Sequence, residues 1–176
     1  IREQTTEQGV FRWLDFGDDA KQSVLKVSQP DLVVMPVYQA MLMLLLTKPC
    51  NDKQIKIANI GVGAGGIERA LTGIEQLALY SVEQNPTVIN LARQYFLLSE
   101  HSVINLRSAE SFFAYQADKS ADNNTETEQL FDVLLIDVFV GTPHMQWLTD
   151  VDFLQVIKAK LALPAQVKQP NECQKP

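Results

Sequence analysis

The sequence has 176 residues, of which 46% are hydrophobic and 20% are charged, and its formal net charge is −6. This length is enough for one well-buried core and short for two, so we expect one globular unit. The acidic total argues against a general nucleic-acid binder, which usually presents a basic face, and it would suit a cationic ligand.

The cysteines and the hydropathy of the sequence argue against a metal site, a disulfide framework and a membrane-spanning segment. Cys50 and Cys173 have no neighbours at metal-ligand spacing, so the sequence predicts neither a metal site nor a disulfide framework. No charged-then-apolar export signal stands at the N-terminus, and we expect a reducing, cytoplasmic location. The most apolar run, residues 32–46, is shorter than the roughly 20 residues that cross a bilayer. We interpret it as a buried helix with a core stripe at residues 41–46, and we predict no membrane contact.

The first elements in chain order are two β-rich stretches. Residues 10–16 and 22–27 are separated by a polar loop and predict an N-terminal β-hairpin within residues 1–30. Pro36 then suits the first turn of a helix, because its missing N–H has no partner to lose there. We expect this helix to run to about Thr47.

From residue 55 the pattern alternates between strand and helix. Apolar, β-branched runs predict four strands, and amphipathic runs predict a helix after each of them. The strands are expected at 55–60, 77–83, 102–108 and 131–140, and the helices at 66–77, 85–98, from 109 and at 150–163. Such alternation predicts a Rossmann-like, doubly wound and mostly parallel α/β sheet over residues 31–176. The proline-containing tail lacks the further strands of a complete sheet, and we expect a C-terminally truncated or unusually short protein.

A glycine cluster follows the first of these strands. Gly61, Gly63 and Gly66 have the G-x-G-x-x-G spacing, and Gly65 is an additional glycine. In such a turn the first glycine lets the chain reverse, the second lets the backbone approach a ligand, and the third lets helix and strand pack closely. A tight strand-to-helix turn without a ligand is the alternative interpretation.

An acidic residue ends the second strand. Glu83 comes 22 residues after Gly61, at the position where this fold places a carboxylate that accepts hydrogen bonds from ribose hydroxyls. An ordinary exposed glutamate is the alternative. The glycines and Glu83 together predict a nucleoside site, and they do not separate a dinucleotide from an adenosyl sulfonium compound.

Four ordered segments resemble one family. The segments "YQAM", "NIGVGAGG", "VEQNPTVINLAR" and "FDVLLIDVF" resemble the Y-[HQ]-E-M motif, glycine loop, V-E-I-D-P-x-V-I segment and catalytic-aspartate strand of the spermidine synthase-like family. The resemblance covers roughly residues 10 to 161. It implies the fold of class I methyltransferases and an S-adenosylmethionine or decarboxylated S-adenosylmethionine co-substrate. It further implies a small-molecule amine acceptor, no metal and a homodimer.

The resemblance also implies roles for single residues. Asp137 would accept a proton from the attacking amine, Glu83 would hold the ribose, and Tyr38 and Gln39 would line the acceptor pocket. The residues implied to contact the co-substrate are Gly61, Gly63, Gly65, Gly66, Glu83, Ser108 and Ala109. His144 and Trp147 could wall the acceptor pocket or belong to an ordinary surface loop.

Three positions depart from the family pattern. Ala64, Ser108 and Val140 stand where the family has carboxylates that face a cation or a donor. Each lost charge-assisted contact is worth about 1.5 to 3 kcal/mol, so we expect impaired or altered aminopropyl transfer. A methyltransferase is an alternative, because Ala64 would leave room for a methionine carboxylate. A non-catalytic binding protein and, more distantly, a nicotinamide enzyme also remain open.

Overall fold

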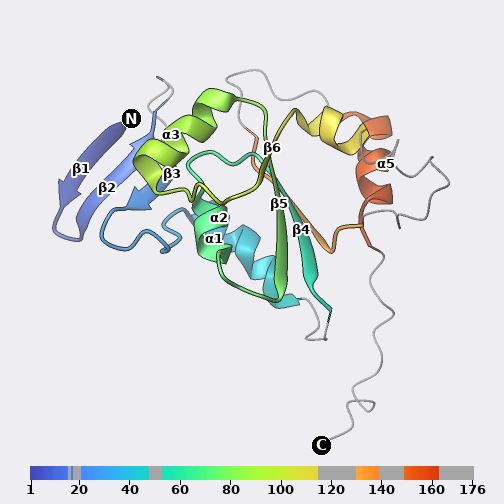
Figure 1. The fold of residues 1–176 in the computed structure, drawn as a ribbon, viewed down its shortest axis with the longest axis horizontal. Coiled ribbons are helices and arrows are strands. Elements are labelled where there is room, and N and C mark those ends of the chain that lie inside the picture. Colours follow the sequence, from blue (N-terminus) through green and yellow to red (C-terminus); the bar gives the residue numbers. More distant parts are fainter. Residues whose placement is uncertain (16, 18–20, 48–52, 115–129, 139–148, 163–176) are drawn as a thin grey trace, which may run out of the picture.

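The computed structural model describes residues 1–15, 17, 21–47, 53–114, 130–138 and 149–162. Its strands form two sheets, shown in Figure 1. One is antiparallel and contains β1 (Arg2–Thr6), β2 (Gly9–Leu14) and β3 (Gln22–Lys26). The other is parallel and contains β4 (Ile55–Ile60), β5 (Leu77–Glu83), β6 (Ile104–Leu106) and β7 (Val133–Ile136).

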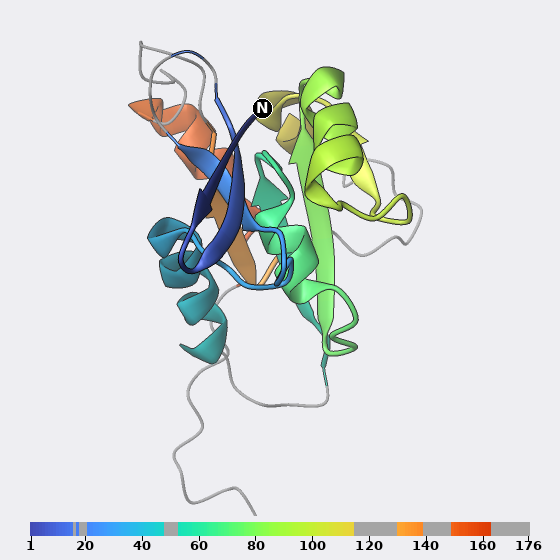
Figure 2. The same cartoon turned by 90° about the vertical axis from the view of Figure 1, so that its left-hand side faces the viewer.

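The antiparallel sheet has one strand more than the sequence predicts. The predicted hairpin corresponds to β2 and β3, and β1 pairs with β2 along its whole length. Every residue of β1 is exposed, and its sequence, Arg-Glu-Gln-Thr-Thr, has no apolar alternation that could reveal a strand. Figure 2 shows this sheet in front of the parallel sheet when the molecule is viewed from the N-terminal side.

The parallel sheet confirms the predicted doubly wound α/β class. Its strand order is β6-β5-β4-β7, and every pair is parallel. The chain moves outward from β4 through β5 to β6 and then returns to place β7 on the other side of β4. The order therefore reverses between β4 and β7, and ligands of such sheets bind beside the carboxyl ends of the strands at a reversal of this kind.

The helices agree with the prediction in order and differ in length. They are α1 (Pro36–Met43), continued by the short 3-10 helix η1 (Leu44–Thr47), α2 (Gly66–Leu71), α3 (Pro86–Phe96), a helical stretch at 109–114 and α5 (Val151–Ala159). Helix α2 ends six residues before the predicted position 77. Gly73 explains the early end, because its backbone is left-handed, with φ 79°.

Side chains on both faces of the parallel sheet are covered by helices. In β4, Ala58 and Ile60 pack with Phe112 and Phe113 of the 109–114 helix and with α5. Ile57 points to the other face, where α1 and α2 cover it. Figure 1 shows α1, α2 and α3 on one side of β4 and β5 and α5 on the other. The result is a three-layer arrangement, with the parallel sheet between two layers of helices.

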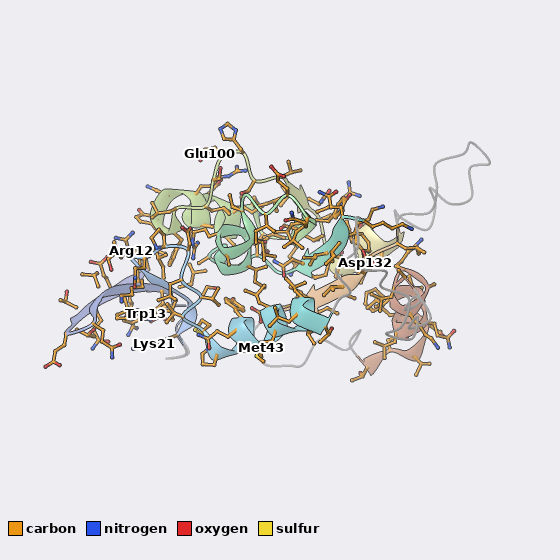
Figure 3. All side chains as sticks on the ribbon, turned by 90° about the horizontal axis from the view of Figure 1, so that it is seen from below. Arg12, Trp13, Lys21, Met43, Glu100 and Asp132 are labelled. Atoms are coloured by element: carbon orange, nitrogen blue, oxygen red, sulfur yellow. The ribbon has the colours of Figure 1, made fainter. Side chains whose placement is uncertain are left out.

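The prediction that residues 41–46 form a core stripe is confirmed only in part, because Met41, Leu42 and Leu45 pack half-buried against the core while the other residues of the run are exposed. Tyr38 is the buried residue of α1, whereas Met43 is 64% exposed and Leu46 is 83% exposed. Met43 lies on the outer side of α1 in Figure 3. The helix contacts the sheet through one stripe, so apolar residues around the rest of its circumference face outward. No helix in the described part of the chain is long and apolar enough to span a membrane.

Two arginines connect the antiparallel sheet and its neighbouring segments to α3. Arg69 of α2 is buried and donates hydrogen bonds to the carbonyl oxygens of Pro30, Ala64 and Phe96. Arg12 of β2, labelled in Figure 3, donates from Nη1 to the carbonyl oxygen of Tyr95, and 2.6 Å separates the two atoms. Both cations therefore satisfy carbonyl groups at the C-terminal end of α3, where a positive charge is favoured.

Candidate functional site

The predicted site residues gather at one edge of the parallel sheet. Gly61 follows β4, Glu83 ends β5, Ser108 follows β6 and Asp137 follows β7. Because the four strands are parallel and adjacent, their carboxyl ends meet at this edge. The fold thus brings together residues that lie up to 76 positions apart in the chain, counted from Gly61 to Asp137.

The Glu83 carboxylate is bound to the glycine turn. Its Oε2 accepts a hydrogen bond from the backbone N–H of Val62 at 3.2 Å, and its Oε1 accepts one from the N–H of Asn85 at 2.9 Å. Glu83 is half-buried. A carboxylate offers about four acceptor positions, so two remain for hydroxyl groups of a ligand. The convergence of Glu83 and the turn, on which the predicted nucleoside site depends, is present.

The four glycines of the turn are each explained by a close protein neighbour. A Cβ on Gly61 would lie 1.9 Å from the carbonyl oxygen of Asp137, and one on Gly63 would lie 2.4 Å from Oγ of Ser23. Gly65 has a left-handed backbone and faces Leu98, and Gly66 faces the ring of Tyr38. Close packing within the protein therefore accounts for all four glycines, and it is Glu83 rather than the glycines that favours a ligand here.

Asp137 lies beside Tyr38 at the point where the strand order reverses. The backbone N–H of Asp137 donates to the carbonyl oxygen of Ile60, and this bond continues the pairing of β7 with β4. The Tyr38 phenol lies near enough to the Asp137 carboxylate to sense its charge, and its hydroxyl is hydrogen-bonded to Ser23 Oγ at 2.9 Å. Burial, and then the negative charge of Asp137, raise the pKa of Tyr38 well above its ordinary value. The phenol is therefore protonated at neutral pH and can donate to the carboxylate.

Three other predicted residues have local roles. The Oγ of Ser108 accepts a hydrogen bond from the N–H of Ser111 and so caps the 109–114 helix. Ala109 is buried in the core cluster of that helix, which leaves its backbone as the part that could contact a ligand. Gln39 is exposed, and its amide donates to the carbonyl oxygen of Val33 at 2.8 Å.

The predicted consequence of Ala64 is corrected by its environment. Ala64 is fully buried and packs with Leu14, Leu25 and Phe96 rather than facing accessible space. Its small side chain therefore leaves no room for the carboxylate of S-adenosylmethionine. Val140, His144 and Trp147 lie outside the described residues, as do both cysteines. Among the residues described, no cluster of three or more His, Cys, Asp or Glu side chains could hold a metal ion.

Sequence reasoning missed Ser23. This residue of β3 is buried, and its Oγ lies 2.9 Å from the hydroxyl oxygen of Tyr38. A serine in a short β-rich stretch gives no signal by itself. Its proximity to the site follows from the packing of the antiparallel sheet against the glycine turn, which local patterns do not encode.

Comparison with curated proteins gives polyamine aminopropyltransferases as relatives. No family model matches the chain. A polyamine aminopropyltransferase of Chromobacterium violaceum is 29% identical over 160 residues, which are 90% of this chain and 57% of the relative. A polyamine aminopropyltransferase of Neisseria meningitidis is 28% identical over 76% of this chain and 53% of the relative. The chain thus spans about half the length of the curated relatives it matches.

Solved structures agree on the fold. A probable spermidine synthase from Corynebacterium glutamicum superposes with a TM-score of 0.59 and 18% identity, over 92% of this chain and 60% of that one. Human methyltransferase-like protein 13, solved in complex with SAH, gives a TM-score of 0.51 and 21% identity over 70% of this chain and 59% of that one. These similarities show the class I methyltransferase fold. The chain is thus similar in sequence to polyamine aminopropyltransferases and similar in fold to a probable spermidine synthase.

Proposed function

We propose that this chain binds an adenosyl sulfonium co-substrate, S-adenosylmethionine or its decarboxylated form, at the carboxyl edge of the parallel sheet. The observation that carries the proposal is the position of Glu83, which two backbone N–H groups hold against the glycine turn. The acceptor positions left on this carboxylate suit the two hydroxyl groups of a ribose. The names of the sequence relatives favour an aminopropyl group as the part transferred.

Asp137 is proposed to receive the proton of the acceptor amine. The amine nitrogen attacks the carbon next to the sulfonium, the carbon–sulfur bond breaks, and its electron pair leaves on the sulfur as a neutral thioether. The attacking nitrogen loses a proton, which passes to the Asp137 carboxylate. Asp137 is partly exposed at the reversal of the strand order, so an acceptor can approach it.

The acceptor is proposed to be a small amine related to the polyamines. Glu83 and Asp137 supply negative charge at the sheet edge, and Val140 stands where the resembled family has the second acid of its catalytic loop. Fewer carboxylates bind a doubly charged diamine less tightly, so transfer to such an acceptor should be weak or its specificity altered. A homodimer, which the family resemblance predicts, stays a prediction.

Methyl transfer is the second candidate, and the fold shared with human methyltransferase-like protein 13 favours it. The burial of Ala64 removes the sequence argument that residue 64 selects between the two co-substrates. The choice therefore depends on which sulfonium compound binds more tightly.

Calorimetry tests this function. S-adenosylmethionine, decarboxylated S-adenosylmethionine and 5′-methylthioadenosine are titrated into the wild type, E83Q and the control E75Q, whose exposed glutamate precedes β5 at the opposite end of the sheet. We expect binding by the wild type and by E75Q, with affinity at least about tenfold lower in E83Q, the size of a lost charge-assisted hydrogen bond. Failure of all three compounds to bind the wild type at millimolar concentration would refute the proposal.

A further inference from the structure

Ser23 occupies an irregular position in β3. Arg12 pairs with Leu25 and Leu14 pairs with Gln22, so Trp13 of β2 stands opposite both Ser23 and Val24. This is the arrangement of a β-bulge, in which one strand has an extra residue and a side chain is turned out of its regular direction.

The backbone of Ser23 is in the left-handed region. Its φ is 53°, one of two positive values among the non-glycine residues described. This conformation costs an L-residue free energy, and such positions persist where the surrounding structure holds them, often beside functional sites. The side chain that the bulge directs inward is 6% exposed.

The inward direction places the Ser23 hydroxyl between two parts of the candidate site. Its Oγ lies 2.9 Å from the Tyr38 hydroxyl oxygen, and it fills the space in which a side chain on Gly63 would lie. Tyr38 in turn lies beside Asp137, whose negative charge helps to raise the pKa of the phenol. A phenol has one proton, so a phenol that donates to the carboxylate must accept at its oxygen from Ser23. Donation of the phenol proton to Asp137 would therefore give a directed chain from Ser23 through Tyr38 to Asp137.

We propose that Ser23 is a positioning residue of the Asp137 site: its hydroxyl donates to the Tyr38 oxygen and so fixes the phenol proton on the Asp137 carboxylate. The role rests on the proposed function of Asp137 as proton acceptor. A carboxylate held on one side by the phenol presents its remaining acceptor positions to the amine in one orientation, which favours proton transfer. The antiparallel sheet thereby contributes a residue to a site whose other members come from the parallel sheet and helix α1.

A merely structural role predicts different behaviour from a positioning role. If Ser23 only fills space beside Gly63, the effect of removing its hydroxyl should not depend on the Tyr38 hydroxyl. If it acts through Tyr38, the hydroxyl should matter only while the phenol is present. A cycle of S23A, Y38F and the double variant separates the two cases.

The kinetic arm compares kcat for aminopropyl transfer with the dissociation constant of decarboxylated S-adenosylmethionine. We expect S23A and Y38F each to lower kcat about tenfold, the double variant to lower it no further than Y38F alone, and the dissociation constants to stay within about twofold. The control S99A, which removes a half-buried turn hydroxyl that accepts a hydrogen bond from the N–H of His101, should match the kcat of the wild type. Independent kinetic losses that multiply in the double variant would overturn the inference.

S23G provides a second comparison. Glycine adopts a positive φ without strain, so S23G should melt at a higher temperature than S23A while sharing its loss of kcat. A kinetic loss that followed melting temperature, and was therefore milder in S23G, would show a structural role and overturn the inference.

The same variants report on the contact when turnover is absent. Urea denaturation of the four proteins in the cycle measures the coupling between the two hydroxyl groups without any ligand. A wild type that binds no adenosyl ligand defeats the proposed function, and the urea cycle then decides on the hydroxyl contact: coupling supports it, and additive effects overturn it.

Discussion

Asn59 of β4 and Glu68 of α2 are in contact between the parallel sheet and α2, where Asn59 Nδ2 donates a hydrogen bond to Glu68 Oε1 at 2.8 Å. The hydroxyl of Ser81 donates to the same oxygen at 2.7 Å. Within the described part of the chain, Glu68 Oε2 and Asn59 Oδ1 have no hydrogen-bond partner. Burial raises the pKa of Glu68 above its ordinary value near 4.5. A neutral carboxylic acid, which can donate from Oε2, suits this environment better than a carboxylate.

Replacing Glu68 with glutamine should remove a pH-dependent loss of stability. Because the folded pKa is raised, the native state binds more protons than the unfolded state above about pH 4.5. The contribution of Glu68 to the free energy of unfolding of the wild type is therefore largest below that pH, and it is lost as the pH rises through the folded pKa. Glutamine stays neutral, so the difference in unfolding free energy, E68Q minus wild type, should increase from pH 4.5 to pH 8 in urea denaturation.

The alanine variant is the matched control for Glu68. E68A leaves Asn59 and Ser81 without their partner and should cost about 1 to 3 kcal/mol at pH 4.5, and this cost should shrink toward pH 8 as the wild type loses stability. A difference between E68Q and the wild type that stayed constant with pH would contradict a neutral Glu68.

Gly65 and Gly73 form a matched pair for testing the packing of the turn. Both have a left-handed backbone, but a Cβ on Gly65 would lie 2.8 Å from Leu98 Cδ1, whereas nothing lies within 4 Å of one on Gly73. We expect G73A to cost about 1 kcal/mol for the backbone alone. G65A should cost a further 1 to 3 kcal/mol, approximately, for overpacking, measured by urea denaturation. Equal losses of unfolding free energy in the two variants would show that the Leu98 side chain moves aside without cost, and would contradict overpacking at Gly65.

Asp137 and Asp132 lie at opposite ends of β7 and should respond differently to the same substitution. D137N should lower kcat at least about a hundredfold, the size of a lost general base, while binding of the co-substrate persists. The carboxylate of Asp132 (Figure 3) accepts a hydrogen bond from the N–H of Lys56 at 2.9 Å, which the amide oxygen of asparagine can also accept. Steady-state kinetics should therefore find D132N close to the wild type. Turnover by D137N at the wild-type rate would exclude Asp137 as the base.

Leu46 and Ile57 test the corrected position of the apolar run. Leu46 is 83% exposed and Ile57 is fully buried, although the sequence alone makes both appear to be core residues. L46Q should change the free energy of unfolding by less than about 0.5 kcal/mol. I57A should cost about 2 to 5 kcal/mol through the cavity it creates. A large loss in L46Q, measured in dilute protein, would place Leu46 in a core.

The sequence allowed the alternation of strands and helices to be predicted because period and turn residues are local signals. The position of Glu83 beside the turn was likewise predictable, since parallel neighbouring strands bring their carboxyl ends together. Strand β1 and the outward face of α1 were not predictable, because the first lacks apolar residues and the second has them on every side. The contact of Ser23 with Tyr38 joins the antiparallel sheet to helix α1 through a bulge, and neither residue type predicts such a contact.

The three hydrogen bonds from Arg69 to carbonyl groups should affect local unfolding of the protein. Pro30, Ala64 and Phe96 belong to segments that are remote in the chain, yet one guanidinium holds all of them. Local unfolding of any one segment would leave N–H donors of the buried guanidinium without an acceptor. The three segments should therefore open together, with a common free energy of local unfolding. Amide protons near these three positions should consequently exchange with solvent deuterium as a single cooperative unit.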